Sequence, residues 1–212
     1  MDPEQSISAF TEALGSGAPT PGGGAASALV GALAAALAEM VARFTVGRKA
    51  YLSVAPAAEE IVRKAERARL ALQALVAEDE LAFRSVSAAY KRPQTTDEER
   101  SERDAAIQAA LLLAMQPPMS VVHTARDVVA LALSIAEIGN QTVLSDAACA
   151  ATLGEAAARS AALNVLANVA LMHDAEAAER ALADARQGVA ETARLREETL
   201  AAVYLRMGVS GI

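Results

Sequence analysis

The sequence predicts an all-α protein, built as a single up-and-down bundle of long helices in which residues 1–212 form one domain. Three observations favour this class. Hydrophobic residues make up 53% of the chain and aromatic residues only 3%, and alanine, the best helix former, dominates the hydrophobic set. The alternation of apolar and polar residues that is typical of strands is absent from the sequence. Long helical patterns follow one another through short connections, as they do in helical bundles.

The first half of the chain predicts three helices. A short amphipathic helix is expected over residues 7–14, before a turn that contains two glycines. A helix of small residues follows Gly24 and runs to about Val46, where the next glycine breaks it. Pro56 suits the first turn of a long helix that reaches about Tyr90.

The second half predicts further helices with clear start and stop signals. Residues 96–99, Thr-Asp-Glu-Glu, form a capping box that starts a helix. The pair Pro117-Pro118 must kink or split that helix. Gly139 with Asn140 fits a left-handed cap at its far end. Beyond the proline pair, one helix is expected to end at residue 138. A second is expected over residues 145–172 and a third over residues 174–207.

Charge and composition exclude several classes of partner. The net charge of −7, from 19 basic and 26 acidic residues, argues against binding to nucleic acid or to an anionic membrane. Cys149 is the only cysteine, so no internal disulfide is expected and a reducing cytoplasm fits. The acidic opening, residues 1–4, does not resemble a cleavable leader. The uncharged stretch Ala25–Ala38 is shorter than the ~20 residues that a membrane span needs. We therefore expect a cytoplasmic protein with no membrane or nucleic-acid partner.

A proline- and glycine-rich run, residues 19–24, precedes the helix of small residues. Gly22, Gly23 and Gly24 can adopt backbone angles that are closed to other residues. They can therefore aim unpaired N–H groups at a ligand from the start of the helix. The alternative is a flexible turn before a tightly packed core helix. Since the run lacks a Lys-Ser/Thr ending and no strand pattern precedes it, neither a Walker nor a Rossmann site is expected.

An acidic residue interrupts the apolar stripe of the long helix that follows Pro56. Asp79 occupies the centre of that stripe, where a leucine would be expected, while Glu78 and Glu80 point to a solvated face. A buried carboxylate is costly unless it is paired or hydrogen-bonded. Asp79 is therefore either a structural ion-pair partner or a functional acid with a shifted pKa. The apolar stripe consists of Ile61, Ala65, Ala68, Leu72, Leu75, Phe83, Val86 and Tyr90.

Other polar residues are less specific. Asp146, Asn164 and Asn168 share a helix face with apolar residues, where buried asparagines often just tie helices together. Asp146 and Asn164 lie about 27 Å apart on a straight helix at ~1.5 Å per residue, so one subunit cannot bring both to one reacting centre. His123 and His173 have no partners at ligand spacing, and no metal site is expected.

Six short motifs, spread in order over nearly the whole chain, carry a family resemblance. They are Ala18–Gly24, Thr45–Lys49, Asp79–Phe83 with Tyr90, Pro93–Glu99, Gly139–Asn140 with Ser145–Asp146, and Ala161–Val165. Together they resemble the cyclodeaminase/cyclohydrolase domain of the formiminotransferase-cyclodeaminase family of folate one-carbon metabolism. The resemblance implies an all-helical fold, a homo-oligomer of at least two copies, and a tetrahydrofolate substrate with no metal or further cofactor.

The resemblance also implies roles for individual residues. It places the family's active-site aspartate on Asp79, as the base or acid of the reaction. The backbone of Gly22–Gly24 and the charges of Arg48 and Lys49 are expected to bind the substrate and its anionic glutamate. The further substrate-binding candidates are Asn140, Ser145, Asp146 and Asn164. An alternating bundle puts Asp79, the glycines and Asn164 toward one end and the other candidates toward the opposite end, so a site that uses both groups would be completed across a subunit interface.

Three functions fit these residues. Hydrolysis of 5,10-methenyltetrahydrofolate to 10-formyltetrahydrofolate is favoured, because the chain carries no transferase domain. The alternative is a formiminotetrahydrofolate cyclodeaminase, which forms the methenyl compound and ammonia with the same inventory of groups. The non-enzyme alternative is a folate-binding or structural helical assembly, which would have Asp79 ion-paired and remote from any cavity.

Overall fold

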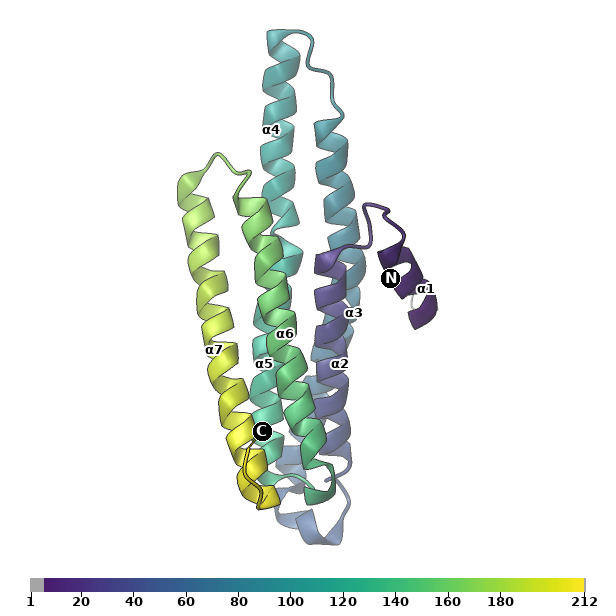
Figure 1. The fold of residues 1–212 in the computed structure, drawn as a ribbon, viewed down its shortest axis with the longest axis vertical. Helices are drawn as coiled ribbons and strands as arrows, with labels where there is room; N and C mark the ends of the chain where they lie inside the picture. Colours follow the sequence, from purple (N-terminus) through teal and green to yellow (C-terminus); the bar gives the residue numbers. More distant parts are fainter. Residues whose placement is uncertain (1–5, 212) are drawn as a thin grey trace.

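The computed structural model describes residues 6–211, and within that range all regular structure is helical (Figure 1). The all-α class is therefore confirmed. The acidic opening lies among residues 1–5, outside the described residues. The helices are α1 Ile7–Gly15, α2 Gly23–Arg43, α3 Ala55–Tyr90, α4 Asp97–Ala114, α5 Gln116–Ile138, α6 Leu144–Val169 and α7 Ala175–Met207, with short 3₁₀ helices η1 Lys49–Val54 and η2 Gln141–Val143.

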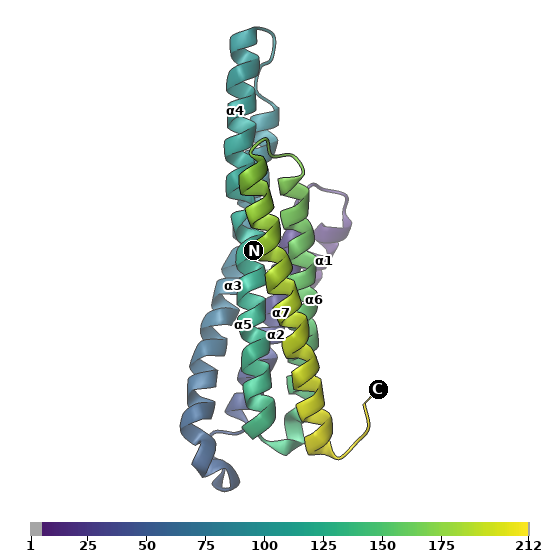
Figure 2. The same cartoon turned by 90° about the vertical axis from the view of Figure 1, so that its left-hand side faces the viewer.

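Five long helices, α2, α3, α5, α6 and α7, run side by side along the long axis of the molecule (Figures 1 and 2). The upper part of α3 and the antiparallel α4 extend as a hairpin beyond the ends of the other helices. The short α1 lies to one side, beside the start of α2 (Figure 1). The start of α2 lies level with Asp79, in the second half of α3, and this level is where the candidate site forms.

Local sequence signals set the helix boundaries. The backbone N–H of Glu99 donates to Thr96 Oγ1 at 3.2 Å and that of Thr96 donates to Glu99 Oε2 at 3.2 Å, so the predicted capping box is present. The predicted break at the proline pair is also confirmed, because α4 ends at Ala114 and α5 begins at Gln116. Asp174 caps α7 by accepting a hydrogen bond from the next turn.

Small residues allow the helices to approach closely. A β-carbon on Gly31 of α2 would stand 3.0 Å from a methyl group of Leu72 on α3. One on Gly154 of α6 would stand 2.5 Å from a methyl group of Val129 on α5. The alanines of α2 are buried in the same contacts. Along most of its length the small-residue helix therefore packs against other helices, while its first turn faces a cavity.

Helix α2 extends beyond the uncharged stretch Ala25–Ala38 at both ends. The helix extends to Arg43, so its 21 residues, with a mean hydropathy of 1.8, are long and apolar enough to cross a membrane by length and composition. The length of the whole helix therefore does not exclude a span, although the uncharged stretch Ala25–Ala38 within it is shorter than one. The stretch Asp97–Ile138, taken across the break between α4 and α5, passes the same test with a mean hydropathy of 1.5. Since 61% of the α2 window is buried inside the protein, α2 fits a core helix as well as it fits a span.

The predicted left-handed cap after α5 is wrong. Gly139 has φ −75° and ψ 179°, which is extended backbone. The reason is tertiary, because the next residue is drawn across to the loop after α2. The backbone N–H of Asn140 donates to Thr45 Oγ1 at 3.0 Å and its side-chain amide donates to the Phe44 carbonyl at 3.0 Å. A chain that turned left-handed at Gly139 would direct Asn140 elsewhere.

Candidate active site

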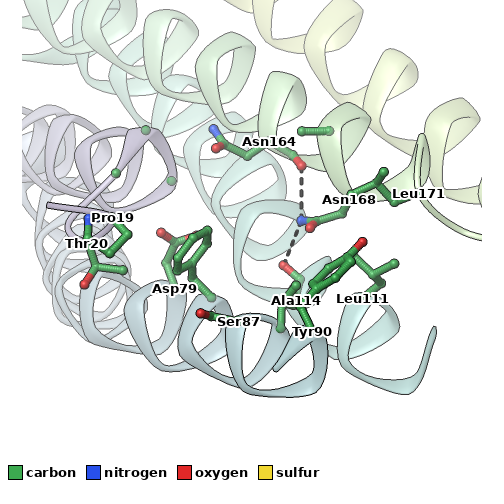
Figure 3. Close-up of a pocket in the computed structure, with 16 residues that line it drawn as sticks. Pro19, Thr20, Asp79, Ser87, Tyr90, Leu111, Ala114, Asn164, Asn168 and Leu171 are labelled. Atoms are coloured by element: carbon green, nitrogen blue, oxygen red, sulfur yellow. Dashed lines mark hydrogen bonds between the residues drawn. The ribbon is translucent and has the colours of Figure 1, made fainter. Parts of the chain in front are cut away.

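A pocket of about 560 Å³ opens beside the first turn of α2 (Figure 3). Four helices and the run before α2 form its walls, and most of its lining is apolar. The lining residues are Pro19, Thr20 and Gly22–Gly24 around the start of α2, Asp79, Phe83, Val86, Ser87 and Tyr90 of α3, Leu111 and Ala114 of α4, and Asn164, Ala167 and Asn168 of α6 with Leu171 after it. The pocket therefore gathers Asp79, the three glycines and Asn164 from the sequence-predicted set.

The carboxylate of Asp79 packs directly against the backbone of Gly24. A β-carbon built on Gly24 would stand 2.0 Å from Asp79 Oδ1 and 2.5 Å from its carboxyl carbon, far inside any real contact. Only glycine leaves room for the carboxylate at this position. The first turn of α2 has unpaired backbone N–H groups, which favour a negative charge beside them.

Burial controls the ionisation of Asp79. The side chain is half-buried, and desolvation raises the pKa of its carboxyl above the ordinary aspartate value. Hydrogen bonding from the backbone amide of Ala25 acts the other way, and the nearby charge of Glu80 raises the pKa further. Among residues 6–211, no basic side chain lies within 4.0 Å of this carboxylate. The structural ion-pair interpretation of Asp79 therefore finds no partner in the described chain.

Glu39 on α2 is a carboxylate with a structural role, and its environment can be compared with that of Asp79. It is buried, and it pairs with Arg43 at 2.7 Å and Arg69 at 2.9 Å. Burial opposes its charged form, but hydrogen bonds from the two arginines outweigh that effect and hold the pKa of Glu39 below its usual value. Asp79, with a raised pKa and a cavity in place of cations, has the opposite environment. An acid of this kind suits proton transfer.

Two asparagines of α6 form the wall opposite Asp79 (Figure 3). Asn168 donates from Nδ2 to the carbonyl oxygens of Ala114 and Asn164, each at 3.2 Å, and so ties α6 to the end of α4. Asn164 donates to Ser160 O at 3.0 Å, and its Oδ1 stands near the Cα of Gly23. Within the described residues no donor reaches that Oδ1 atom, so it remains available to a ligand. The helix-tying role that the sequence left open for asparagines thus applies to Asn168.

The glycine run works by close approach, and the prediction that it uses special backbone angles is wrong. Gly22 precedes α2 in extended backbone, with φ −126° and ψ −162°, and Gly23 and Gly24 begin the helix. None of the three has a positive φ. Their value is steric, because Gly24 admits the carboxylate of Asp79 and Gly23 brings the backbone near Asn164. A side chain at Gly24 would occupy the place of the acid.

The remaining predicted residues lie at the opposite end of the helices. Arg48 stacks over the Phe44 ring at 5.8 Å, and Lys49 beside it begins η1. Asn140 is 3% exposed, and its hydrogen bonds join the loop after α2 to the start of η2. Ser145 and Asp146 stand in the first turn of α6, while Asn164 lies near its last. One chain therefore does not bring these five residues to the pocket, as the spacing along α6 predicted.

Only part of the pocket lining carries a signal in the sequence. Phe83 and Tyr90 continue the apolar stripe of α3, but they are 45% and 42% exposed because this part of α3 rises beyond its neighbours and lines the pocket. Leu111 and Asn168 come from α4 and α6. The spacing of apolar residues along the sequence identifies the apolar face of a helix. It does not show which residues of that face contact other helices and which line a cavity.

Each histidine lies near one aspartate, and His173 stands in the connection between α6 and α7 rather than in a helix. His123 contacts Asp184 at 3.0 Å, and His173 lies 3.5 Å from Asp104. In the described part of the chain, no group of three or more histidine, cysteine, aspartate or glutamate side chains is placed to hold a metal ion.

The fold and the pocket together define a class of all-α protein in which a half-buried acid packs against the glycine-lined start of a helix. The sequence model of the formiminotransferase-cyclodeaminase family matches residues 6–187, and the chain belongs to this family. It is 41% identical to the methenyltetrahydrofolate cyclohydrolase of Methylorubrum extorquens, over 93% of this chain and 95% of that protein.

Two further relatives lie in the cyclodeaminase branch. The chain is 34% identical to the formimidoyltransferase-cyclodeaminase of Rattus norvegicus over 81% of its own length, and it spans only 32% of that longer protein. The crystal structure of the formiminotetrahydrofolate cyclodeaminase of Thermotoga maritima superimposes with a TM-score of 0.86 at 33% identity, covering 96% of this chain and 98% of that one.

Proposed function

We propose that this protein is a methenyltetrahydrofolate cyclohydrolase, which converts 5,10-methenyltetrahydrofolate and water into 10-formyltetrahydrofolate. The observation that carries the proposal is the position of Asp79, a half-buried acid with a raised pKa at the wall of an apolar pocket. The relative from Methylorubrum extorquens, which this chain matches over nearly its full length, bears that name. The reaction requires only the folate, water and this acid, so we propose no metal and no further cofactor.

The carboxylate of Asp79 can serve each proton transfer. The bound substrate is cationic at its methenyl carbon, and its charge favours the ionised form of the acid next to it. Water attacks that carbon, and Asp79 takes a proton from the attacking water. As the tetrahedral intermediate collapses, the bond from the carbon to N5 breaks, N5 gains a proton and the hydroxyl loses one. One proton leaves in total, which balances the conversion of a cation and water into a neutral formyl group.

The rest of the pocket suits a flat heterocycle. Gly23 and Gly24 present bare backbone at the start of α2, and the free Oδ1 of Asn164 faces the same space. Backbone N–H groups and one amide oxygen can pair with the donors and acceptors at the edge of a pterin. We therefore propose Gly22, Gly23, Gly24 and Asn164 as substrate-binding residues and Asp79 as the catalytic one.

The runner-up is a formiminotetrahydrofolate cyclodeaminase, the activity that the structural relative from Thermotoga maritima is named for. In that reaction N10 attacks the formimino carbon and the departing ammonia takes a proton, which the same acid could supply. The non-enzyme alternative required an ion-paired Asp79 remote from any cavity. Asp79 instead lines the pocket.

One assay separates the three functions. The purified protein is given 5,10-methenyltetrahydrofolate or the formimino compound while the methenyl absorbance is followed. Loss of absorbance from the methenyl compound, faster than in buffer alone, supports the hydrolase. A gain of absorbance from the formimino compound with release of ammonia indicates the deaminase, and no change with either compound contradicts both enzyme proposals.

We also propose that residues 1–212 form one domain, a single up-and-down bundle that acts in the cytoplasm as a homo-oligomer of at least two copies. Arg48, Lys49, Asn140, Ser145 and Asp146 could then reach the pocket only from a partner subunit. Light scattering coupled to size exclusion measures the oligomeric state. Mixing an inactive Asp79→Asn protein with an inactive Arg48→Ala protein tests the shared site, because mixed oligomers would regain activity only if each site takes residues from two subunits.

A further inference from the structure

An arginine lies beside the upper rim of the pocket and, among residues 6–211, belongs to no ion pair. Arg103 of α4 donates from Nε to the carbonyl oxygen of Tyr90 at 3.2 Å. Its guanidinium carbon stands 5.5 Å from the centre of the Tyr90 ring, within the range of a cation–π contact. Tyr90 itself lines the pocket (Figure 3). The two residues therefore form one unit that joins a flat aromatic wall to a positive charge.

The charge of Arg103 is not neutralised by its neighbours. Two acids close to it in sequence have other partners, because Asp97 pairs with Arg100 and Asp104 lies near His173. Across residues 6–211, no carboxylate comes within 4.0 Å of the Arg103 guanidinium. A guanidinium has five N–H donors, and the bond to Tyr90 uses one of them. The others remain free to bind a carboxylate, for which their fork geometry is suited.

The spacing along α3 places this unit where the far end of a folate would lie. Tyr90 is about 16 Å from Asp79 along the helix, at ~1.5 Å per residue. The benzoyl-glutamate arm extends about 10 Å beyond the reacting carbon when standard bond lengths are summed. The long side chain of arginine covers most of the remaining gap. A folate with its methenyl carbon at Asp79 and its arm directed up α3 would thus point its carboxylates toward Arg103 beside Tyr90.

We propose that Tyr90 and Arg103 form the subsite for the benzoyl-glutamate arm of the substrate, and that Arg103 is the residue that makes the enzyme prefer a substrate with a glutamate. This inference rests on the proposed function. It differs from the assignment of the tail to Arg48 and Lys49, which lie at the other end of the helices and would need a second subunit. Arg103 needs none, since it comes from the same end of the same chain as Asp79.

The test compares two substrates that differ only in the tail. 5,10-Methenyltetrahydrofolate carries the glutamate, and 5,10-methenyltetrahydropteroate ends at the benzoate. For Arg103→Ala we expect the KM for the glutamate substrate to rise at least tenfold, with kcat within twofold of wild type and the KM for the pteroate unchanged. Arg103→Lys keeps the charge and loses the fork, so it should recover part of the lost affinity.

The matched control is Arg92→Ala, which removes the same charge from the connection between α3 and α4 and should change neither KM. Equal changes in both KM values for Arg103→Ala, or no change in either, would overturn the inference. So would a tail-specific rise in KM that occurs in Arg48→Ala and is missing in Arg103→Ala. A wild-type protein that hydrolyses neither substrate would refute the proposed function itself, which separates the two failures.

Discussion

Asp79 Oδ1 lies so close to the backbone of Gly24 that a β-carbon added to Gly24 would stand only 2.0 Å from it. The acid on α3 and the glycine on α2 are thus a matched pair, although 55 residues separate them in sequence. On the side of α2 the close approach shields the carboxylate from water and places it beside the N–H groups of that helix start, while its other side faces the pocket. Each of the first three predictions depends on this contact.

Gly24→Ala should abolish turnover by displacing the acid. The new methyl group cannot coexist with the carboxylate, so either Asp79 changes rotamer or α2 shifts away from α3. We expect kcat to fall by at least 10²-fold, comparable to the loss of a general acid or base. Steady-state kinetics measure this. Gly22→Ala, whose methyl group would meet only a carbonyl oxygen at 4.0 Å, should retain much more of kcat.

A control outside the site completes that comparison. Gly15→Ala adds the same methyl group at the end of α1, where nothing lies within 4 Å, and should behave like wild type. If Gly24→Ala keeps full activity, the packing of Asp79 against α2 is not needed for catalysis.

Asp79→Asn should remove catalysis and leave the protein at least as stable as wild type. The amide has the same shape but cannot accept the proton of water, so kcat should fall about 10²–10⁴-fold. Because burial raises the pKa of Asp79, the folded state holds the proton more tightly than the unfolded state. Protonated Asp79 therefore contributes favourably to the free energy of unfolding at low pH, and this contribution is lost as pH rises through its pKa. At neutral pH the charged carboxylate opposes folding.

Circular dichroism melts of wild type and Asp79→Asn at pH 7 check the stability, and methenyl absorbance checks the rate. A variant that melts well below wild type would show that the carboxylate has a structural partner, and unchanged turnover would remove Asp79 from the mechanism.

The pH dependence of kcat/KM, which reports the free enzyme, should show the same acid. As a base, Asp79 must be ionised, so kcat/KM should decline as pH falls through its pKa. Desolvation places that pKa above the ordinary value, which is about 3.9 for aspartate. The acid limb of the profile, corrected for uncatalysed hydrolysis, should therefore lie above the range of an exposed aspartate. A rate that stays constant down to pH 4 would contradict this role.

The fold could be predicted because its determinants are local. Thr96 and Glu99 form their capping box within one turn, and the proline pair ends α4 without help from other helices. The cap at Gly139 was mispredicted because its conformation depends on Thr45, which is distant in sequence and reaches Asn140 only in the folded chain.

The site could be predicted only where a residue violates its own pattern. Asp79 was found because an acid interrupts an apolar stripe. Its contact with Gly24 depends on how α2 packs on α3, which periodicity does not encode. Arg103 carried no local signal at all, since on α4 it reads as one more exposed arginine until the structure places Tyr90 under it. The roles of these residues stay predictions until the variants are measured.

The ion-pair cluster of Glu39 should supply stability and not catalysis. Glu39→Gln leaves Arg43 and Arg69 without their buried partner, and we expect a loss of about 1–2 kcal/mol at pH 7, reduced from the cost of a fully buried pair because Arg43 is largely exposed. The pKa of Glu39 is lowered in the folded state, so this stability is present at neutral pH and disappears as pH falls through that pKa.

Urea unfolding of wild type and Glu39→Gln at pH 7 and at pH 4 measures the difference, which should shrink at the lower pH. Glu60→Gln is the matched control, because Glu60 also pairs with basic neighbours but does so in full solvent, where such pairs contribute little. Equal losses for the two variants would mean that burial does not strengthen the Glu39 pairs.

Asn140→Ala tests whether the residues at the far end hold the fold, the substrate or both. The side chain donates to the Phe44 carbonyl and accepts from the backbone and the hydroxyl of Thr142, and it is almost fully buried. Its removal leaves those groups unpaired, so we expect a loss of about 2–3 kcal/mol in the free energy of unfolding. Urea titration measures that loss.

The KM of the Asn140→Ala variant, measured at a temperature where the protein is folded, then decides whether Asn140 also binds the substrate. A KM equal to that of wild type would confine Asn140 to the loops between helices, whereas a raised KM would require that a partner subunit delivers it to the pocket of Asp79.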